Sequence, residues 1–261
     1  MAAPDLKELL RRGERLIGPF LQINSPELVE IIGHTGFDFL IIDTEHGPFG
    51  TETAVNLVRA AQAVDLISII RVARNEESLI SKALDTGTQG IIVPQINSLE
   101  AAEMAVKSGK FHPQGSRGAC PFVRAAKYSS TDYVGFYEDA NRETSLILLI
   151  EGKGGIESLE SILKLPGVDV ALIGPVDLSH ALGVPGQINH PLVEERIEDM
   201  LEAARGIGRS LGIFAYEIED AKKWLKLGFQ FLAYSVDAVM FTRVCQASVR
   251  ELKERKGDQK R

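Results

Sequence analysis

The chain has 261 residues, of which 44% are hydrophobic and 25% charged, and its formal net charge is −7. This composition is ordinary for a soluble globular protein, and the length is close to the roughly 250 residues of one (β/α)8 barrel. The sequence contains no run of about 18 apolar residues and no cluster of basic residues outside its last few positions. It therefore predicts neither a membrane span nor nucleic acid binding.

The start of the chain and the cysteine content bear on its location. The first residues, MAAPDLKELLRRGERL, form a charged amphipathic stretch without the apolar centre of a secretory signal. Cys120 and Cys245 are the two cysteines, too few for a disulfide framework. Both features predict a cytoplasmic protein.

Eight short runs rich in Ile, Leu, Val or Phe follow one another along the chain. Most are continuous rather than alternating, which is typical of parallel strands buried on both faces. The predicted strands are Pro19–Ile23, Phe37–Asp43, Leu66–Val72, Gly90–Gln95, Ser145–Glu151, Val168–Gly174, Leu211–Tyr216 and Phe229–Ser235.

Longer amphipathic segments between these runs predict helices. They are Thr51–Val64, Asn75–Thr86, Ser98–Ser108, Pro191–Ser210 and Glu219–Leu227. Ser98 and Asn75 are predicted N-caps, with acidic residues following them in the first turn. Four glycines are predicted to follow helix C-termini: Gly87, Gly109, Gly167 and Gly228.

The alternation of eight strands with helices predicts an α/β fold, a single parallel eight-stranded (β/α)8 TIM barrel. The one domain spans residues 1–261, with the barrel at about 16–250 and a polar tail at 253–261. A doubly wound open sheet is the alternative, but the first strand-turn-helix carries no GxGxxG. The irregular segment Gly109–Arg142 is too long for a single turn, and such insertions are often functional.

Polar residues gather at the C-terminal ends of the predicted strands, where barrel enzymes build their active sites. Glu151 ends the run SLILLIE, and Asp177 lies three residues past the run VALIG. Neighbouring strands lie about 4.8 Å apart, so the two carboxylates can converge on one cation. Singly, each would be an ordinary surface acid. Together they predict a site for a hard ion such as Mg²⁺ or Mn²⁺.

Three further residues suggest acid–base and anion chemistry. His46 lies in a Gly-Pro turn after a predicted strand, where a histidine can transfer a proton near neutral pH or simply hydrogen-bond within the turn. Asp85 ends a predicted helix and could orient His46, or be a solvated acid. Arg71 ends the run LISIIR, and its charge needs an anionic partner. That partner is a substrate carboxylate or enolate, or, in a structural role, Asp43 or Glu45.

Two other catalytic routes lack their residues. No lysine stands at the end of a core strand, which argues against a Schiff-base aldolase. Cys120 has Arg117 nearby but no histidine in its vicinity, which argues against a thiol nucleophile. The remaining histidines are interpreted as surface or loop residues: His34, His112, His180 and His190.

An ordered set of motifs runs through the chain: FLIIDTEHGP, IIRVA, LDTGTQGIIVPQINSLEAAE, GSRGACPFVRAAKY, LILLIEGKGGIESLESILKLPGVDVALIGPVDLS and FLAYSVDAVMF. These motifs resemble those of the metal-dependent (class II) pyruvate aldolases. That family includes 4-hydroxy-2-oxoheptanedioate aldolase, 2-dehydro-3-deoxyglucarate aldolase and macrophomate synthase, and belongs with the citrate lyase β-like proteins. The resemblance runs from about Leu16 to Val249.

The resemblance implies a role for each residue singled out above. Glu151 and Asp177 match the two metal ligands, and His46 matches the catalytic base. Arg71 matches the arginine that stabilises the enolate, and Asp85 the acid that supports the histidine. The backbone of the loop that holds the pyruvate carboxylate is matched by Gly174, Pro175, Val176 and Asp177.

The resemblance also implies an assembly. Enzymes of this family are usually hexamers built from trimers, and their last helix packs onto a neighbouring subunit. That helix corresponds to about Asp237–Leu252 in this chain.

Three positions depart from the family pattern. Leu149 stands where the family often has glutamine, and period-two geometry points it the same way as Glu151. Ala73 replaces a usual proline, and Cys120 a common glycine. These departures leave the substrate and the reaction open.

The sequence thus predicts a lyase that forms or cleaves a 4-hydroxy-2-oxo acid through a pyruvate enolate. Its expected cofactor is a divalent metal, Mg²⁺ or Mn²⁺ first, with Co²⁺ and Zn²⁺ as further candidates. The expected partners are a small 2-oxo acid (pyruvate, oxaloacetate or a hydroxy-oxo acid) and further copies of the chain. The alternatives are an oxaloacetate decarboxylase, a macrophomate-synthase-like enzyme using the same enolate, and a non-catalytic metabolite-binding barrel.

Overall fold

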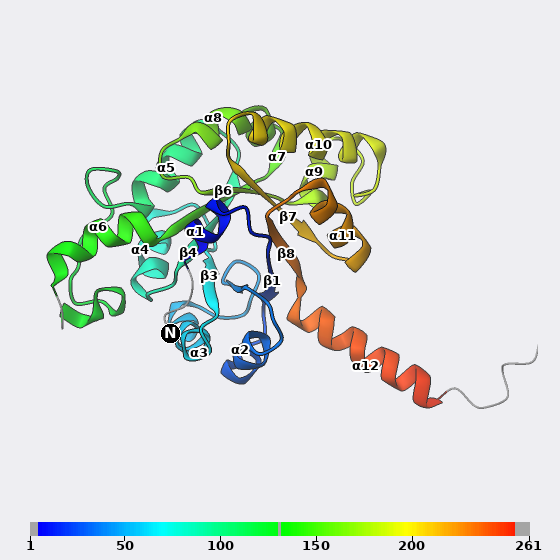
Figure 1. Ribbon diagram of the computed structural model, residues 1–261, viewed down its shortest axis with the longest axis horizontal. Coiled ribbons are helices and arrows are strands. Elements are labelled where there is room, and N and C mark those ends of the chain that lie inside the picture. Colours follow the sequence, from blue (N-terminus) through cyan, green and yellow to red (C-terminus); the bar gives the residue numbers. More distant parts are fainter. Residues whose placement is uncertain (1–4, 130–131, 254–261) are drawn as a thin grey trace, which may run out of the picture.

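Eight parallel strands close into one barrel in the computed structural model, which describes residues 5–129 and 132–253. Helices connect the strands and surround them (Figure 1). The strands are β1 (Leu16–Leu21), β2 (Phe39–Asp43), β3 (Ile67–Arg71), β4 (Gly90–Ile96), β5 (Ser145–Ile150), β6 (Val170–Ile173), β7 (Ser210–Ala215) and β8 (Phe231–Val236). The predicted (β/α)8 barrel is confirmed.

The described helices are α1 (Leu6–Arg11), α2 (Pro26–Gly33), α3 (Thr51–Ala63), α4 (Glu77–Asp85), α5 (Leu99–Gly109), the 3-10 helix η1 (Arg124–Ser129), α6 (Tyr133–Glu143), α7 (Gly152–Glu157), α8 (Leu159–Lys164), α9 (Pro175–Ala181), α10 (Pro191–Gly206), α11 (Ile218–Leu227) and α12 (Asp237–Lys253). The five predicted amphipathic helices correspond to α3, α4, α5, α10 and α11. Beyond Lys253, the predicted polar tail lies outside the described residues.

The strand with the largest displacement from its prediction is β1. It begins at Leu16 rather than at Pro19, because Leu16 pairs with Phe231 of β8 where the barrel closes. A Cβ atom on Gly18 would lie 2.1 Å from the carbonyl oxygen of Phe39, so glycine is required where β1 approaches β2. This glycine marks a close strand contact rather than a turn.

The core has two layers separated by the barrel wall. Alternate strand residues point inward, and inside the barrel the rings of Phe39 and Phe231 stack with their centroids 4.4 Å apart. Leu6 and Leu10 of α1 belong to this interior cluster, so α1 closes the N-terminal end of the barrel. The larger apolar cluster fills the space between strands and helices.

The predicted helix ends are partly confirmed. The hydroxyl of Ser98 accepts a hydrogen bond from the Ala101 N–H at 3.2 Å, as expected of an N-cap. The Asn75 prediction is wrong, since Glu76 occupies the N-cap position and the Asn75 amide instead donates to the Ala101 carbonyl at 2.8 Å. Gly109 also differs from its prediction, because it is the last residue of α5.

The other three predicted glycines do have the left-handed backbone that follows a helix. Their φ angles are +81° at Gly87, +94° at Gly167 and +104° at Gly228. Gly228 directly follows α11, where its N–H bonds back to the last helical turn.

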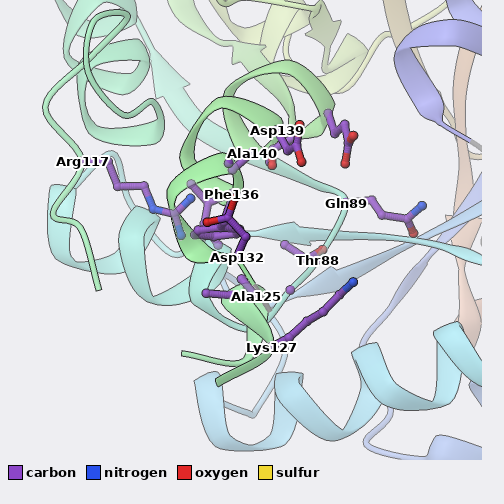
Figure 2. A pocket seen from close by; sticks show the side chains of 15 residues that line it. Thr88, Gln89, Arg117, Ala125, Lys127, Asp132, Phe136, Asp139 and Ala140 are labelled. Carbon is purple, nitrogen blue, oxygen red and sulfur yellow. The ribbon is translucent and has the colours of Figure 1, made fainter. Parts of the chain in front are cut away.

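The described residues of the irregular segment Gly109–Arg142 lie at the N-terminal end of the strands. Together with Thr88 and Gln89, which precede β4, it lines a cavity of about 400 Å³. Figure 2 shows this cavity, with Arg117 on one side and Gln89 on the other. Within one chain, none of the described residues of the segment lines the cavity at the opposite end of the barrel.

Within this segment, Lys110 is buried, with an exposed fraction of 2%. Its Nζ donates hydrogen bonds to the carbonyl oxygens of Asn141 at 3.0 Å and Thr144 at 2.7 Å. Burial lowers the pKa of Lys110 to about 7, and the positive charge of Lys7 adds to this, while Asp169 opposes it. The folded protein therefore favours a neutral lysine here.

A stability measurement tests this lysine. The free energy of unfolding should rise from about pH 7 toward 10.5, because the unfolded Lys110 holds a proton there that the folded side chain has released. The free-energy cost of burying the charged lysine is complete below about pH 7 and disappears near pH 10.5. Urea unfolding across this range should show a flatter pH dependence for Lys110→Met than for the exposed control Lys107→Met. Equal slopes in the two variants would contradict the prediction.

The last described helix, α12, leaves the barrel and extends away from it (Figure 1). It exposes large apolar side chains: Phe241 at 68%, Val244 at 65%, Val249 at 48% and Leu252 at 85%. Among residues 5–129 and 132–253, no helix is both long and apolar enough to cross a membrane. The predicted contact of α12 with a neighbouring subunit stays a prediction.

Candidate active site

Six of the predicted site residues share one cavity at the C-terminal end of the barrel, whereas Glu151 is not among its lining residues. The cavity volume is about 240 Å³, and His46, Arg71 and Asp177 line it together with Gly174, Pro175 and Val176. The other lining residues are Phe20, Gln22, Leu149, Leu172, Phe214 and Val236. Parallel strands bring these distant segments together because all of them end at the same rim.

Arg71, the last residue of β3, is held by two carboxylates. Asp43 ends the neighbouring strand β2 and accepts hydrogen bonds from Arg71 Nε at 2.9 Å and Nη2 at 2.8 Å. Glu45 Oε2 lies 3.1 Å from Nη1. This bidentate grip fixes the plane of the guanidinium group and leaves some of its five N–H groups unused.

The carboxylate of Asp43 organises the surrounding loop as well. Asp43 is fully buried and accepts from the backbone N–H groups of Glu45 at 3.1 Å and His46 at 3.3 Å. Burial acts to raise the pKa of Asp43, but the hydrogen bonds and charge of Arg71, with the amide of Gln22, hold it below its usual value. Asp43 therefore stays ionised beside the arginine.

The two predicted metal ligands stand on adjacent strands. Glu151 directly follows β5, and Asp177 lies in the first turn of α9 after β6. Leu149 pairs with Leu172 and Ile150 with Ile173, so the two strand ends are level. A Cβ atom on Gly174 would lie 2.6 Å from Asp177 Oδ2, so this glycine leaves the space that the carboxylate occupies.

The electrostatics of this pair favour a cation. Burial raises the pKa of Glu151 to about 7, and the negative charges of Asp177 and Glu45 add to the effect. Burial likewise raises the pKa of Glu45, against the lowering effect of Arg71 and His46. Negative charge is thus crowded between β2, β5 and β6, and a cation at Glu151 and Asp177 would relieve it.

The donor chemistry fits a hard divalent ion. Among the described residues, no group of three or more His, Cys, Asp or Glu side chains is arranged to hold a metal. Mg²⁺ commonly binds proteins through one or two carboxylates, with waters and substrate oxygens completing its coordination. Glu151 and Asp177 match that pattern, whereas a closed structural zinc site would need four protein ligands.

His46 and Asp85 are not brought together within one chain. His46 is exposed in the turn after β2, at the C-terminal end of the barrel. Asp85 ends α4, just before β4, and its Oδ1 lies 2.7 Å from Arg117 Nη2. Because α4 leads back to the start of a strand, Asp85 lies at the opposite end, and it could assist His46 only from a second copy of the chain.

Sequence reasoning did not single out two residues of this site. Gln22 follows β1 and donates to Asp43 Oδ2 at 2.8 Å. Gln95 lies in β4 with a left-handed φ of +60°, and its amide is 3.4 Å from Glu45 Oε1. Both stood inside apolar runs predicted as strands. A polar residue near the C-terminal end of such a run was the available signal.

Comparison with known proteins agrees with this geometry. The family model described as HpcH/HpaI aldolase/citrate lyase matches residues 16–243. A 2-keto-3-deoxy-L-rhamnonate aldolase from Salmonella gallinarum is 33% identical over 237 residues, which cover 90% of this chain and 88% of that protein.

Two solved structures are similar over nearly their full length. An HpcH/HpaI aldolase/citrate lyase family protein from Burkholderia cenocepacia has 32% identity and a TM-score of 0.90, covering 95% of this chain and 99% of that one. The citrate synthase SbnG has 32% identity and a TM-score of 0.85, covering 95% and 97%. The chain therefore belongs to the HpcH/HpaI aldolase/citrate lyase family and is an enzyme of the aldolase type.

Proposed function

We propose that this enzyme forms or cleaves a 4-hydroxy-2-oxo acid through the enolate of pyruvate. The observation that carries the proposal is the arrangement at one rim of the barrel. Asp177 lines one cavity with the fixed guanidinium of Arg71 and the exposed imidazole of His46. Glu151, the other carboxylate of the proposed metal-binding pair, is close enough to Asp177 and Arg71 for their charges to shift its pKa.

Glu151 and Asp177 are the residues that would hold the divalent metal, with Mg²⁺ or Mn²⁺ the first candidates and Co²⁺ and Zn²⁺ after them. When bound, the ion supplies Lewis-acid polarisation of a 2-oxo acid. Crowding of negative charge at the pair supports this assignment.

The chain's own residues would divide the remaining work. His46, exposed at the rim, removes the proton from the 4-hydroxyl group in the cleavage direction. The C3–C4 bond then breaks, and Arg71 donates hydrogen bonds to the enolate oxygen as its charge develops. Because Asp43 already fixes the guanidinium, little reorganisation is needed at that moment.

The loop Gly174–Pro175–Val176–Asp177 would hold the carboxylate of the substrate. It lines the cavity at the start of α9, where the first backbone N–H groups of a helix have no helical partners. Asp85 takes part in this proposal only as a residue contributed by a second copy of the chain, where it would orient His46.

Exchange of the methyl protons of pyruvate in D2O, followed by NMR, tests the proposal without knowledge of the aldehyde. Exchange should require added Mg²⁺ or Mn²⁺ and should stop with EDTA. Absence of exchange with any of the four metals, in folded protein, would overturn the proposed enolate chemistry.

Replacement of His46 by asparagine should slow aldol cleavage by roughly 10²–10⁴-fold, the usual contribution of a general base. The amount of bound metal should stay unchanged, because His46 is not one of the proposed ligands. Steady-state cleavage of a 4-hydroxy-2-oxo acid and metal analysis of the purified variant provide the measurements. Loss of metal from the His46→Asn protein would show that the role assigned to the histidine is wrong.

A second candidate reaction keeps the same enolate but takes it from oxaloacetate. Leu149 keeps this alternative open, since it places an apolar side chain in the cavity that the proposed metal ligand Asp177 also lines. Release of CO2 from oxaloacetate faster than pyruvate appears from any hydroxy-oxo acid would favour the decarboxylase.

A homo-oligomer, and within it a hexamer built from trimers, is the proposed assembly. Its support is the apolar face of α12, which extends from the barrel with Phe241 and Val244 exposed. Isolated apolar residues are common on surfaces, but a run of them along one projecting helix indicates an interface.

Phe241→Glu should weaken this assembly and reduce the mass measured by light scattering. The exposed control Glu251→Gln, on the same helix, should leave the mass unchanged. An unchanged mass for Phe241→Glu would show that α12 does not form the interface.

A further inference from the structure

A chain of hydrogen bonds joins the first residue of α12 to Arg71 across the mouth of the barrel. Asp237 accepts from the backbone N–H groups of Gln22 at 3.0 Å and Ile23 at 2.8 Å. The side-chain amide of Gln22 donates to Asp43 Oδ2 at 2.8 Å. The same carboxylate accepts the bidentate pair from Arg71 at 2.9 and 2.8 Å.

The two carboxylates and the arginine joined by these hydrogen bonds are shielded from water, and Gln22 between them is half-buried. Asp43 is 0% exposed, Asp237 is 5% exposed, and the Arg71 side chain is 11% exposed. In such surroundings a lost hydrogen bond is not replaced by solvent, so each bond constrains its partners more than a surface contact would. Arg71 is therefore fixed through Asp43, and Asp43 in part through Gln22.

The backbone just before Asp237 has a strained conformation. This conformation places Asp237 beside the end of β1. Ser235 has a left-handed φ of +57° and is fully buried, and its Oγ has no hydrogen-bond partner among the described residues. The pairing of β1 with β8 shifts register just here, where Phe20 pairs with Val236. Such strain persists only when the surrounding structure over-determines it.

A second contact attaches α12 to the same rim. The guanidinium of Arg243 lies 4.3 Å from the centroid of the Tyr216 ring, and Arg243 also bonds Glu217, both in the turn after β7. Tyr216 borders a small cavity shared with Pro175 and Val176. These contacts thus hold the first turns of α12 against the segments that follow β1 and β7.

We propose that Gln22 and Asp237 are positioning residues for Arg71, and that α12 sets the geometry of the active site through them. This inference rests on the proposed function, because it takes Arg71 to act on the enolate. If α12 were displaced, the guanidinium of Arg71 would be held less firmly and the reaction would be slower, while the residues that bind metal would be unchanged.

The test compares Gln22→Leu and Asp237→Asn with Asp38→Asn in pyruvate proton exchange at saturating Mn²⁺. Asp38 is a matched control, because its Oδ2 also accepts a backbone N–H, that of Ile17 in β1 at 2.8 Å, but at the other end of the barrel. Gln22→Leu and Asp237→Asn should lower kcat roughly tenfold to a hundredfold with little change in KM, since small misplacements of a group that acts in the transition state have such effects. Asp38→Asn should keep the original kcat.

The double variant makes the test stricter. If Asp237 acts through Gln22, Gln22→Leu combined with Asp237→Asn should lower kcat no further than Gln22→Leu alone. Two independent, multiplying losses, or equal losses in Asp38→Asn at a similar melting temperature, would overturn the inference and point to general destabilisation.

Crystal structures of the variants separate this inference from the proposed function. The guanidinium of Arg71 should leave its bidentate position on Asp43 in Gln22→Leu and keep it in Asp38→Asn. An unmoved Arg71 would overturn the inference whether or not the enzyme exchanges pyruvate protons. A displaced Arg71 in an enzyme that shows no exchange would support the inference and reject the proposed reaction.

Discussion

Glu151→Gln is expected to abolish metal-dependent exchange of pyruvate protons. Glutamine keeps the size of the side chain but removes the negative charge that a hard cation requires. The affinity for Mn²⁺, measured by calorimetry on dialysed protein, should fall roughly a hundredfold or more, since even outer partners of a metal site contribute about 10–100-fold.

Glu157→Gln provides the matched control. Glu157 ends the short helix α7, which begins directly after Glu151; its side chain is exposed, and its Oε1 lies 3.8 Å from Lys153 Nζ. Its replacement should leave Mn²⁺ binding and exchange unchanged. If Glu151→Gln bound Mn²⁺ as tightly as the original protein, the ligand assignment would be wrong, and the acidic group around Glu45 would be the next site to examine.

The same glutamate predicts how metal binding depends on pH. In the metal-free protein the pKa of Glu151 is raised to about 7 by burial and by the charges of Asp177 and Glu45. A cation binds the ionised form, so protons compete with it below that pKa. Apparent Mn²⁺ affinity should therefore fall about tenfold per pH unit below 7 and level off above it. Glu151→Gln should lose this dependence.

The sequence predicted the barrel because its signals are local. Each strand is a short apolar run, and each helix an amphipathic one, so the order of elements was readable without knowing which strands pair. The start of β1 could not be predicted in this way, because Leu16 belongs to β1 only through its pairing with β8. Asn75 shows the same limit, since its amide bonds a carbonyl from α5 rather than capping its own helix.

Those site residues could be predicted whose place in the site follows from their position at the end of a strand. Glu151, Asp177 and Arg71 stand at strand ends or just beyond them, and barrel geometry alone predicts that they converge. The supporting contacts depend on side-chain directions that no pattern encodes. Gln22 reaches Asp43 across a strand boundary, and Asp85 turns to Arg117 at the far end of the barrel.

Arg71→Lys is expected to lower kcat for pyruvate proton exchange by roughly 10²–10³-fold, the usual effect of removing a donor that stabilises an oxyanion. Lysine retains the positive charge that Asp43 requires, so the protein should fold. It lacks the planar fork that grips Asp43 while presenting further N–H groups to the enolate. Mn²⁺ affinity should change little.

Arg74→Lys is the control for this prediction, because Arg74 lies three residues further on and pairs with Glu76 at the surface. It should keep the original kcat. Two interpretations of Arg71 are then separated. If Arg71 serves only as a structural ion pair with Asp43 and Glu45, Arg71→Lys would lower the stability of the protein and leave proton exchange intact. A loss of exchange at unchanged metal affinity would show that those contacts aim the guanidinium at the substrate.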